Sequence, residues 1–154
     1  MSFREGYGFE TEIKSDIAPI NGLMEKSLSI GGIVSAKDPT RGGLANTVNE
    51  FSDKSKVGIV LEEDNIPIPK GVRSACDMLG IDPLEIGNEG KVVIGVVKEK
   101  ADDVLTEIKK HPLGKNAVII GEATDKVKGV VLKTTVGGKR NLHKPIGDPV
   151  PRIC

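Results

Sequence analysis

The stretch Asp38-Pro39-Thr40-Arg41-Gly42-Gly43 follows a short apolar run at residues 33–36 and precedes a segment in which Leu44, Val48 and Phe51 recur at helical spacing. The apolar run has the length of a strand and the later segment has the period of an amphipathic helix, so the sequence predicts a strand, a turn and a helix in that order. A strand that leads through a tight turn into a helix indicates a domain in which helices cover a sheet.

The same turn is a candidate ligand-binding loop. Its two glycines let the backbone approach a ligand closely, and the N–H groups at the start of a helix attract anions. Arg41 can pair with a phosphate or a carboxylate. The alternative is a well-capped turn in which Arg41 makes a surface ion pair, and the residue types alone favour that alternative. The stretch lacks the Lys-Ser/Thr of a Walker loop.

The rest of the chain alternates loosely between helix-like and strand-like segments, which predicts an α+β domain with helices covering a mixed β-sheet. Three further helices are expected from their apolar spacing: one capped by Ser15 or Asp16 with apolar positions Ile17, Ile20, Met24 and Leu28, one from Lys70 to Gly80, and one from Ala101 to about His111. Further strands are expected at residues 57–61, 92–97, 117–120 and 127–136. Beyond Gly137-Gly138 the chain is interpreted as irregular.

Composition excludes several classes of protein. The formal net charge of the 154 residues is zero and no long basic run is present, which argues against nucleic acid as a partner. No apolar run approaches the roughly 20 residues of a membrane span. The two cysteines are too few for a disulfide framework, so a reducing cytoplasm is the expected location. Two histidines and two cysteines, far apart in the sequence, form no zinc pattern, and no metal ligands are assigned.

Three other residues carry possible chemistry. Cys154 ends the chain behind two prolines, and the segment from Gly147 can reach roughly 25 Å, so it resembles an arm that presents a thiol. The alternative is a frayed terminus. Glu89, next to Asn88 in a loop before a strand, is a candidate base, although a solvated turn carboxylate is the commoner case. Cys76 lies on the apolar face of its helix and is expected in the core, which disfavours a redox pair with Cys154.

These stretches together resemble the C-terminal half of the hydrogenase maturation factor HypE family, within the superfamily named for aminoimidazole ribonucleotide synthase. The resemblance covers essentially the whole chain and is carried by Arg4-Glu5-Gly6, Phe9-Glu10, Asp38-Pro39-Thr40-Arg41-Gly42-Gly43-Leu44-Ala45, Asn49-Glu50, Val57-Gly58-Ile59, Ala75-Cys76, Leu79-Gly80-Ile81-Asp82-Pro83-Leu84, Asn88-Glu89-Gly90, His111-Pro112-Leu113-Gly114 and Pro151-Arg152-Ile153-Cys154. The last of these is the most specific.

The resemblance implies the domain organisation. Residues 1–14 are expected to be a lead-in from an N-terminal ATP-binding domain that this sequence does not contain, residues 15–142 the synthase-like C-terminal domain, and residues 143–154 a mobile tail. In the family, ATP and Mg²⁺ are bound mainly by the N-terminal domain, which also supplies much of a homodimer interface. This chain alone is therefore expected to bind no cofactor and to be inactive.

The resemblance also implies an activity. HypE proteins receive a carbamoyl group from HypF on the terminal thiol, dehydrate it with ATP to a thiocyanate, and pass the cyano group to iron on a HypC–HypD complex for the [NiFe]-hydrogenase centre. Cys154 would then be the carrier nucleophile, Glu89 the base, and Pro151, Arg152 and Ile153 the residues that dock the tail. Contacts to substrate or phosphate would come from Asp38, Thr40, Arg41, Gly42, Gly43 and Asn88. The alternative is a non-catalytic binding module that only presents the tail to maturation partners.

Overall fold

The computed structural model describes residues 15–147. Predictions for the lead-in at residues 1–14, for Cys154 and for the tail-docking residues Pro151, Arg152 and Ile153 lie outside the described residues.

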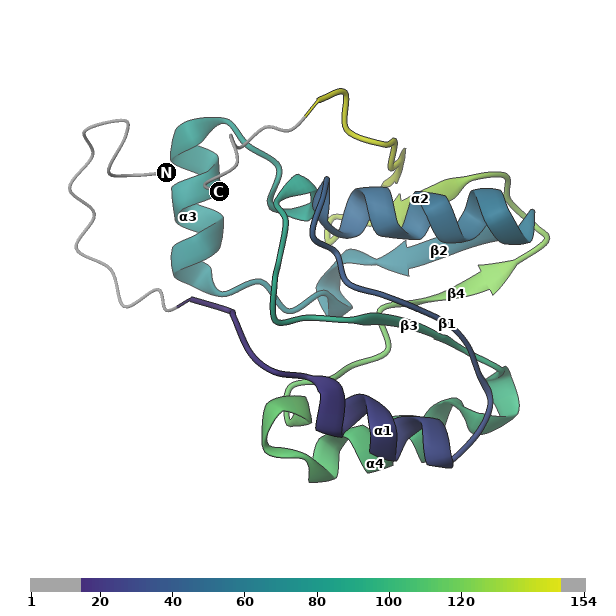
Figure 1. Cartoon of the computed structure of the whole chain (residues 1–154). Coiled ribbons are helices and arrows are strands. Elements are labelled where there is room, and N and C mark those ends of the chain that lie inside the picture. Colours follow the sequence, from purple (N-terminus) through teal and green to yellow (C-terminus); the bar gives the residue numbers. More distant parts are fainter. Residues whose placement is uncertain (1–14, 148–154) are drawn as a thin grey trace.

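The described residues form the α+β fold that the sequence predicts, and their strands build two sheets (Figure 1). The helices are α1 (Asn21–Ser29), α2 (Gly43–Ser55), α3 (Lys70–Leu79) and α4 (Ala101–Lys110), and the strands are β1 (Ile33–Lys37), β2 (Gly58–Glu62), β3 (Val93–Val96), β4 (Gly121–Thr124), β5 (Val130–Lys133) and β6 (Lys139–Asn141). None of these helices has the length and apolar character that crossing a bilayer requires.

The larger sheet is mixed and has the strand order β4-β2-β5-β6. β2 pairs antiparallel with β4 and parallel with β5, and β5 pairs antiparallel with β6. Helix α2 lies along this sheet (Figure 1) and contributes Ala45 and Val48 to the main core, where they meet Leu61 of β2 and Leu132 of β5. Because these side chains are almost completely buried, the position of α2 relative to the sheet is fixed by packing.

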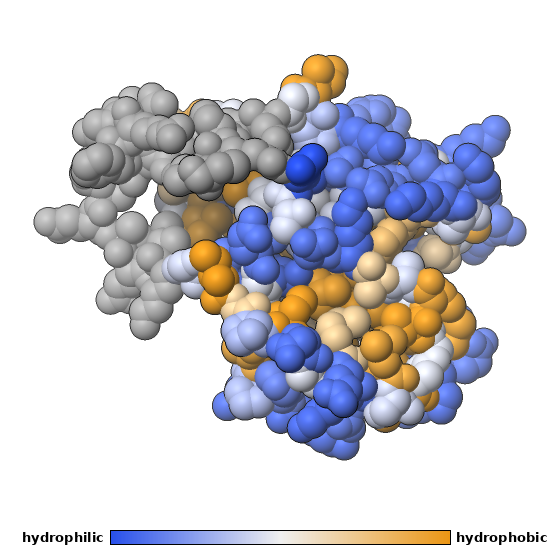
Figure 2. All heavy atoms as spheres, in the orientation of Figure 1, coloured by the Kyte–Doolittle hydropathy of each residue, from blue (hydrophilic) through white to orange (hydrophobic). Residues whose placement is uncertain are grey.

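The smaller sheet consists of β1 and β3, which pair antiparallel, and it lies between the α2 layer and the pair of helices α1 and α4 (Figure 1). Lys37 at the end of β1 is 2.5 Å from a carboxylate oxygen of Glu50 on α2, so an ion pair joins the two layers. Apolar side chains gather on the surface over this sheet (Figure 2), and Val34 of β1 is 71% exposed.

The first helix begins later than the sequence predicts. α1 starts at Asn21 with Ile20 as its N-cap, so the expected cap at Ser15 or Asp16 is wrong. Pro19 disfavours helical backbone at the residue before it, which keeps the preceding segment extended. Ile17 is 75% exposed, and the side chains that α1 buries are Leu23 and Ser27, neither of which was among the predicted apolar positions.

The later strands also differ from the prediction. The strand expected at residues 117–120 forms instead at Gly121–Thr124, and Val118 and Ile119 are 44% and 46% exposed. The strand expected at residues 127–136 is confined to Val130–Lys133. The chain after Gly138 is not irregular, because Lys139–Asn141 forms the edge strand β6. All three β6 residues are exposed, so this strand has no apolar alternation from which it could be recognised.

Candidate functional site

The loop between β1 and α2 lies against a second loop that precedes β3. The backbone N–H of Asn88 donates to the carbonyl oxygen of Pro39 at 2.9 Å. Gly43 has a φ of 60°, and a Cβ on it would fall 2.5 Å from the Leu84 carbonyl oxygen and 2.6 Å from that of Ile86. A Cβ on Gly87 would likewise collide with the carbonyl oxygen of Thr40. The contact is therefore made by backbone, at positions where only glycine fits without displacement.

This contact joins two segments that the sequence analysis treated separately. Gly42 and Gly43 are buried at its centre, Thr40 and Asn88 are half-buried, and Asp38, Arg41 and Glu89 are exposed. The candidate residues within the described range therefore belong to two adjoining loops, whereas Cys154 and the residues before it lie outside that range.

Among the residues that the structure describes, no side chain caps the start of α2. Its N-cap is Gly42, in left-handed conformation with a φ of 64°, and it offers no side chain to the N–H groups of the first turn. Asn46 instead donates its amide N–H to the Arg41 carbonyl oxygen at 3.0 Å and so holds the loop. The uncapped N–H groups at a helix start are suited to an anion.

Arg41 and Glu89 make no ion pair with any residue between 15 and 147. The surface ion pair that was the alternative for Arg41 is therefore not formed within the described residues. Arg41 is exposed and stands two residues before α2, and a guanidinium has the donors that a phosphate oxygen requires. Glu89 is exposed, as both a candidate base and a solvated turn carboxylate would be.

A residue that was predicted as a helix cap instead fixes the second loop. Asp16 accepts a 2.8 Å hydrogen bond from the side-chain amide of Asn88, and the ammonium of Lys91 lies 3.6 Å from the same carboxylate oxygen. A Cβ on Gly90 would collide with the Asp16 carbonyl oxygen, so the two segments cross closely. Sequence reasoning missed this role because 72 residues separate Asp16 from Asn88.

The chemistry implied for the whole family includes ATP and Mg²⁺. Within residues 15–147 no group of three or more His, Cys, Asp or Glu side chains is placed to hold a metal ion. The uncapped start of α2 beside Arg41 does fit a phosphate group.

The cysteine of α3 belongs to the core, as the sequence predicts. Cys76 is 4% exposed, and burial, together with the nearby carboxylates of Asp77 and Asp82, raises the pKa of its thiol. A buried thiol with a raised pKa is a poor nucleophile. This placement opposes the redox interpretation that pairs Cys76 with Cys154.

Known proteins resemble this chain over almost its whole length. A putative hydrogenase expression/formation protein of Methanocaldococcus jannaschii is 57% identical over 152 residues, which are 98% of this chain and 45% of the relative. Carbamoyl dehydratase HypE of Bradyrhizobium diazoefficiens is 45% identical over 157 residues, with 100% of this chain and 45% of the relative covered. The chain thus spans less than half the length of these relatives.

Solved structures show the same relation. A crystal structure of a HypE–HypF complex superimposes with a TM-score of 0.87 at 45% identity, over 94% of this chain and 47% of the other. A structure of HypE in complex with ATP gives a TM-score of 0.89 at 35% identity, over 96% of this chain and 47% of the other. Residues 20–133 match the family described as AIR synthase related protein, C-terminal domain. The chain therefore belongs to the family of AIR synthase related proteins, and within it the chain is similar over almost its whole length to HypE carbamoyl dehydratases.

Proposed function

We propose that this chain is the C-terminal part of a HypE-type carbamoyl dehydratase that serves hydrogenase maturation. Cys154 carries a carbamoyl group as an S-carboxamide, and an ATP-dependent dehydration converts that group to a thiocyanate. The proposal rests on the similarity to HypE proteins and on the paired loops, which bring the Arg41 and Glu89 segments together.

The chemistry requires two kinds of group. The amide oxygen of the S-carboxamide must become a leaving group, and phosphorylation by ATP makes it one. One N–H proton must leave as the oxygen is phosphorylated, and the second must leave as the C–O bond breaks and phosphate departs, so that the carbon ends in a C≡N triple bond. A carboxylate within hydrogen-bond reach of the nitrogen can accept these protons. Glu89 is assigned this role. Arg41 and the N–H groups at the start of α2 are assigned to bind the phosphate group and stabilise its negative charge.

A single observation carries this assignment: the Asn88 N–H bonds the Pro39 carbonyl at 2.9 Å. Glu89 follows Asn88 directly, and Arg41 is two residues from Pro39. The proposed base Glu89 and the proposed anion-binding residue Arg41 therefore belong to two loops whose backbones are hydrogen-bonded to each other. Asn88 is in turn fixed by Asp16, which limits the freedom of the loop that holds the base.

The proposal includes partners and a location. HypF is the expected carbamoyl donor, because a related HypE has been solved in complex with HypF. A HypC–HypD complex is the expected cyano acceptor, and the full-length protein is expected to be a homodimer that binds ATP and Mg²⁺ mainly through its other domain. A carrier thiol must be reduced to react, so the cytoplasm is the expected compartment.

Replacement of Glu89 by Gln in the full-length protein tests the catalytic role. The glutamine keeps the size of the side chain but cannot accept the protons, so cyano formation should fall by about 10²-fold or more while carbamoyl loading of Cys154 persists. Mass spectrometry of the C-terminal peptide, after incubation with the carbamoyl donor and ATP, distinguishes the two adducts. Glu99→Gln, an exposed carboxylate before α4, is the matched control.

Two results would contradict the proposal. Normal cyano formation by Glu89→Gln would remove Glu89 from the chemistry and favour a binding module that only presents the tail. Absence of any carbamoyl adduct on Cys154 in the unmodified protein would remove the carrier role itself.

A further inference from the structure

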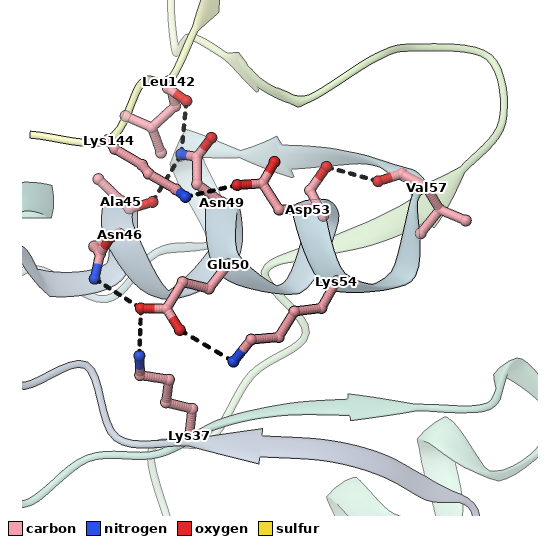
Figure 3. A network of polar contacts seen from close by, with 11 residues as sticks. Lys37, Ala45, Asn46, Asn49, Glu50, Asp53, Lys54, Val57, Leu142 and Lys144 are labelled. Carbon is pink, nitrogen blue, oxygen red and sulfur yellow. Dashed lines mark hydrogen bonds and ion pairs between the residues drawn. The ribbon is translucent and has the colours of Figure 1, made fainter.

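The chain that leads to the C-terminus follows helix α2. Asn49 donates one amide N–H to the Ala45 carbonyl at 2.8 Å and the other to the Leu142 carbonyl at 2.9 Å (Figure 3). Leu142 is 2% exposed, and its N–H bonds the Val130 carbonyl at 2.9 Å. The segment therefore leaves the sheet from a buried point next to the middle of α2.

The next residues continue toward the start of the helix, while the Lys144 side chain reaches back in the other direction. Its ammonium lies 2.6 Å from a carboxylate oxygen of Asp53, one turn beyond Asn49 (Figure 3). The ring of Pro145 is packed over Gly42, where an added Cβ would be 3.2 Å from its Cγ. The chain thus passes from Asn49 to Gly42, antiparallel to α2.

The lengths of the two paths agree. Seven helical residues from Asn49 to Gly42 correspond to about 10 Å. Three residues from Leu142 to Pro145 span about 10 to 11 Å when fully extended. Residues 142–145 are therefore long enough, when extended, to cover the distance along α2 from Asn49 to Gly42.

We propose that α2 guides the carrier tail: Asn49 and Asp53 hold residues 142–145 along the helix so that the tail starts at Gly42, beside the loop pair that carries Arg41 and Glu89. This inference rests on the proposed function of Cys154. The nine residues after Pro145 can reach about 30 Å, which is long enough to expose the thiol to a donor and to return it to the neighbouring loops. Asp53 and Asn49 are positioning residues, since they act on the tail and not on the substrate.

The magnitude follows from the tether. Release of the segment back to Leu142 lengthens the chain between its last anchor and Cys154 from nine to twelve residues, which lowers the effective concentration of the thiol about 1.5-fold. It also moves the origin of the tail about 10 Å away from the loop pair. An exposed ion pair raises the equilibrium population of the state in which residues 142–145 lie along α2 by about fivefold at most. Loss of the pair should therefore slow conversion of the loaded carbamoyl group to cyano by about two- to fivefold.

Charge reversal is the test that isolates the contact. Asp53→Lys places two ammonium groups together, and Lys144→Asp in the same protein restores the pair with opposite polarity. In the full-length protein, Asp53→Lys should slow conversion of the loaded carbamoyl group to cyano about two- to fivefold, leave carbamoyl loading unchanged, and be rescued by the double change. Asp103→Lys on α4 is the matched control, because Asp103 is 63% exposed and Asp53 62% exposed, and each is paired with a lysine.

A second measurement does not depend on activity. A nitroxide attached to Cys154 should broaden the amide signals of Gly42, Gly43 and Glu89 in this chain, and the broadening should weaken in Asp53→Lys and return in the double variant. Equal broadening in all three proteins, or cyano formation that the double change does not rescue, would overturn the guide. A guided tail without any carbamoyl adduct would instead refute the proposed function and leave the guide intact.

Discussion

Gly43→Ala probes the backbone contact on which the paired loops depend. Two separate costs are expected. An L-residue at the φ of 60° observed for Gly43 is strained by about 1 to 2 kcal/mol. The new Cβ would also lie 2.5 and 2.6 Å from the Leu84 and Ile86 carbonyl oxygens. Carbon and oxygen atoms normally approach to about 3.3 Å, so the two loops must separate by about 0.7 Å.

Gly80→Ala supplies a matched control for the strain. Gly80 has a φ of 65°, and an added Cβ there would meet nothing within 4 Å. Its cost should therefore be the conformational part alone, about 1 to 2 kcal/mol. Overpacking typically adds about 1 to 3 kcal/mol, so Gly43→Ala should be less stable than Gly80→Ala by that amount. For a chain of this size, the difference corresponds to a Tm about 2 to 12 °C lower.

Thermal unfolding of the chain measures the difference directly, and cyano formation by the full-length protein carrying each substitution measures its consequence. Gly43→Ala should slow the chemical step because it displaces the loop that holds Glu89, whereas Gly80→Ala should not. Equal Tm values for the two variants would show that the loops do not pack as described, and equal rates would show that their contact does not position the site.

Two further predictions concern titratable groups. The ammonium of Lys37 lowers the pKa of Glu50 below 4.5, so the stabilisation of the folded state by this ion pair is complete above that pH and is lost as the pH falls through the lower folded pKa. The difference in unfolding free energy between the parent and Lys37→Met, measured by urea titration, should therefore shrink below about pH 4.5. A difference that stays constant down to about pH 2 would contradict the pairing. Cys76, with its pKa raised by burial, should react with a thiol reagent only when the chain unfolds, so a second fast-reacting thiol in the native protein would contradict its core position.

The sequence predicts those elements whose signal is local. Leu44 and Val48 recur at helical spacing and identify α2, and the apolar run after Val57 identifies β2. The start of α1 was misplaced, since Asp16 is a reasonable cap by residue type and its actual partner, Asn88, is distant in the sequence. β6 was missed because an exposed edge strand of Lys, Arg and Asn carries no apolar period.

The candidate site was predictable in its residues and not in its assembly. The residue types near Arg41 and Glu89 indicated two separate loops, one that could bind an anion and one that could accept a proton. Their contact depends on Gly43 and Gly87 approaching backbone carbonyl groups, and a sequence shows that a glycine is present without showing what lies above it. The same limitation concealed the tail path, in which Asn49 bonds a carbonyl 93 residues away.

Gly42 and Gly43 lie at the start of α2, at the contact between the two loops and under the segment that leads to the C-terminus. A side chain at Gly43 would displace the second loop, whereas one at Gly42 would meet Asn46 at 2.8 Å and Pro145 at 3.2 Å. The absence of these side chains therefore keeps the start of α2 open to an anion, lets the loops touch and lets the tail segment pass over the helix. A substitution at either glycine changes more than one of these features, so its effect cannot be assigned to the tail. Asp53 stands about three turns further along α2, away from both loops, and for that reason its charge reversal tests the guidance of the tail by itself.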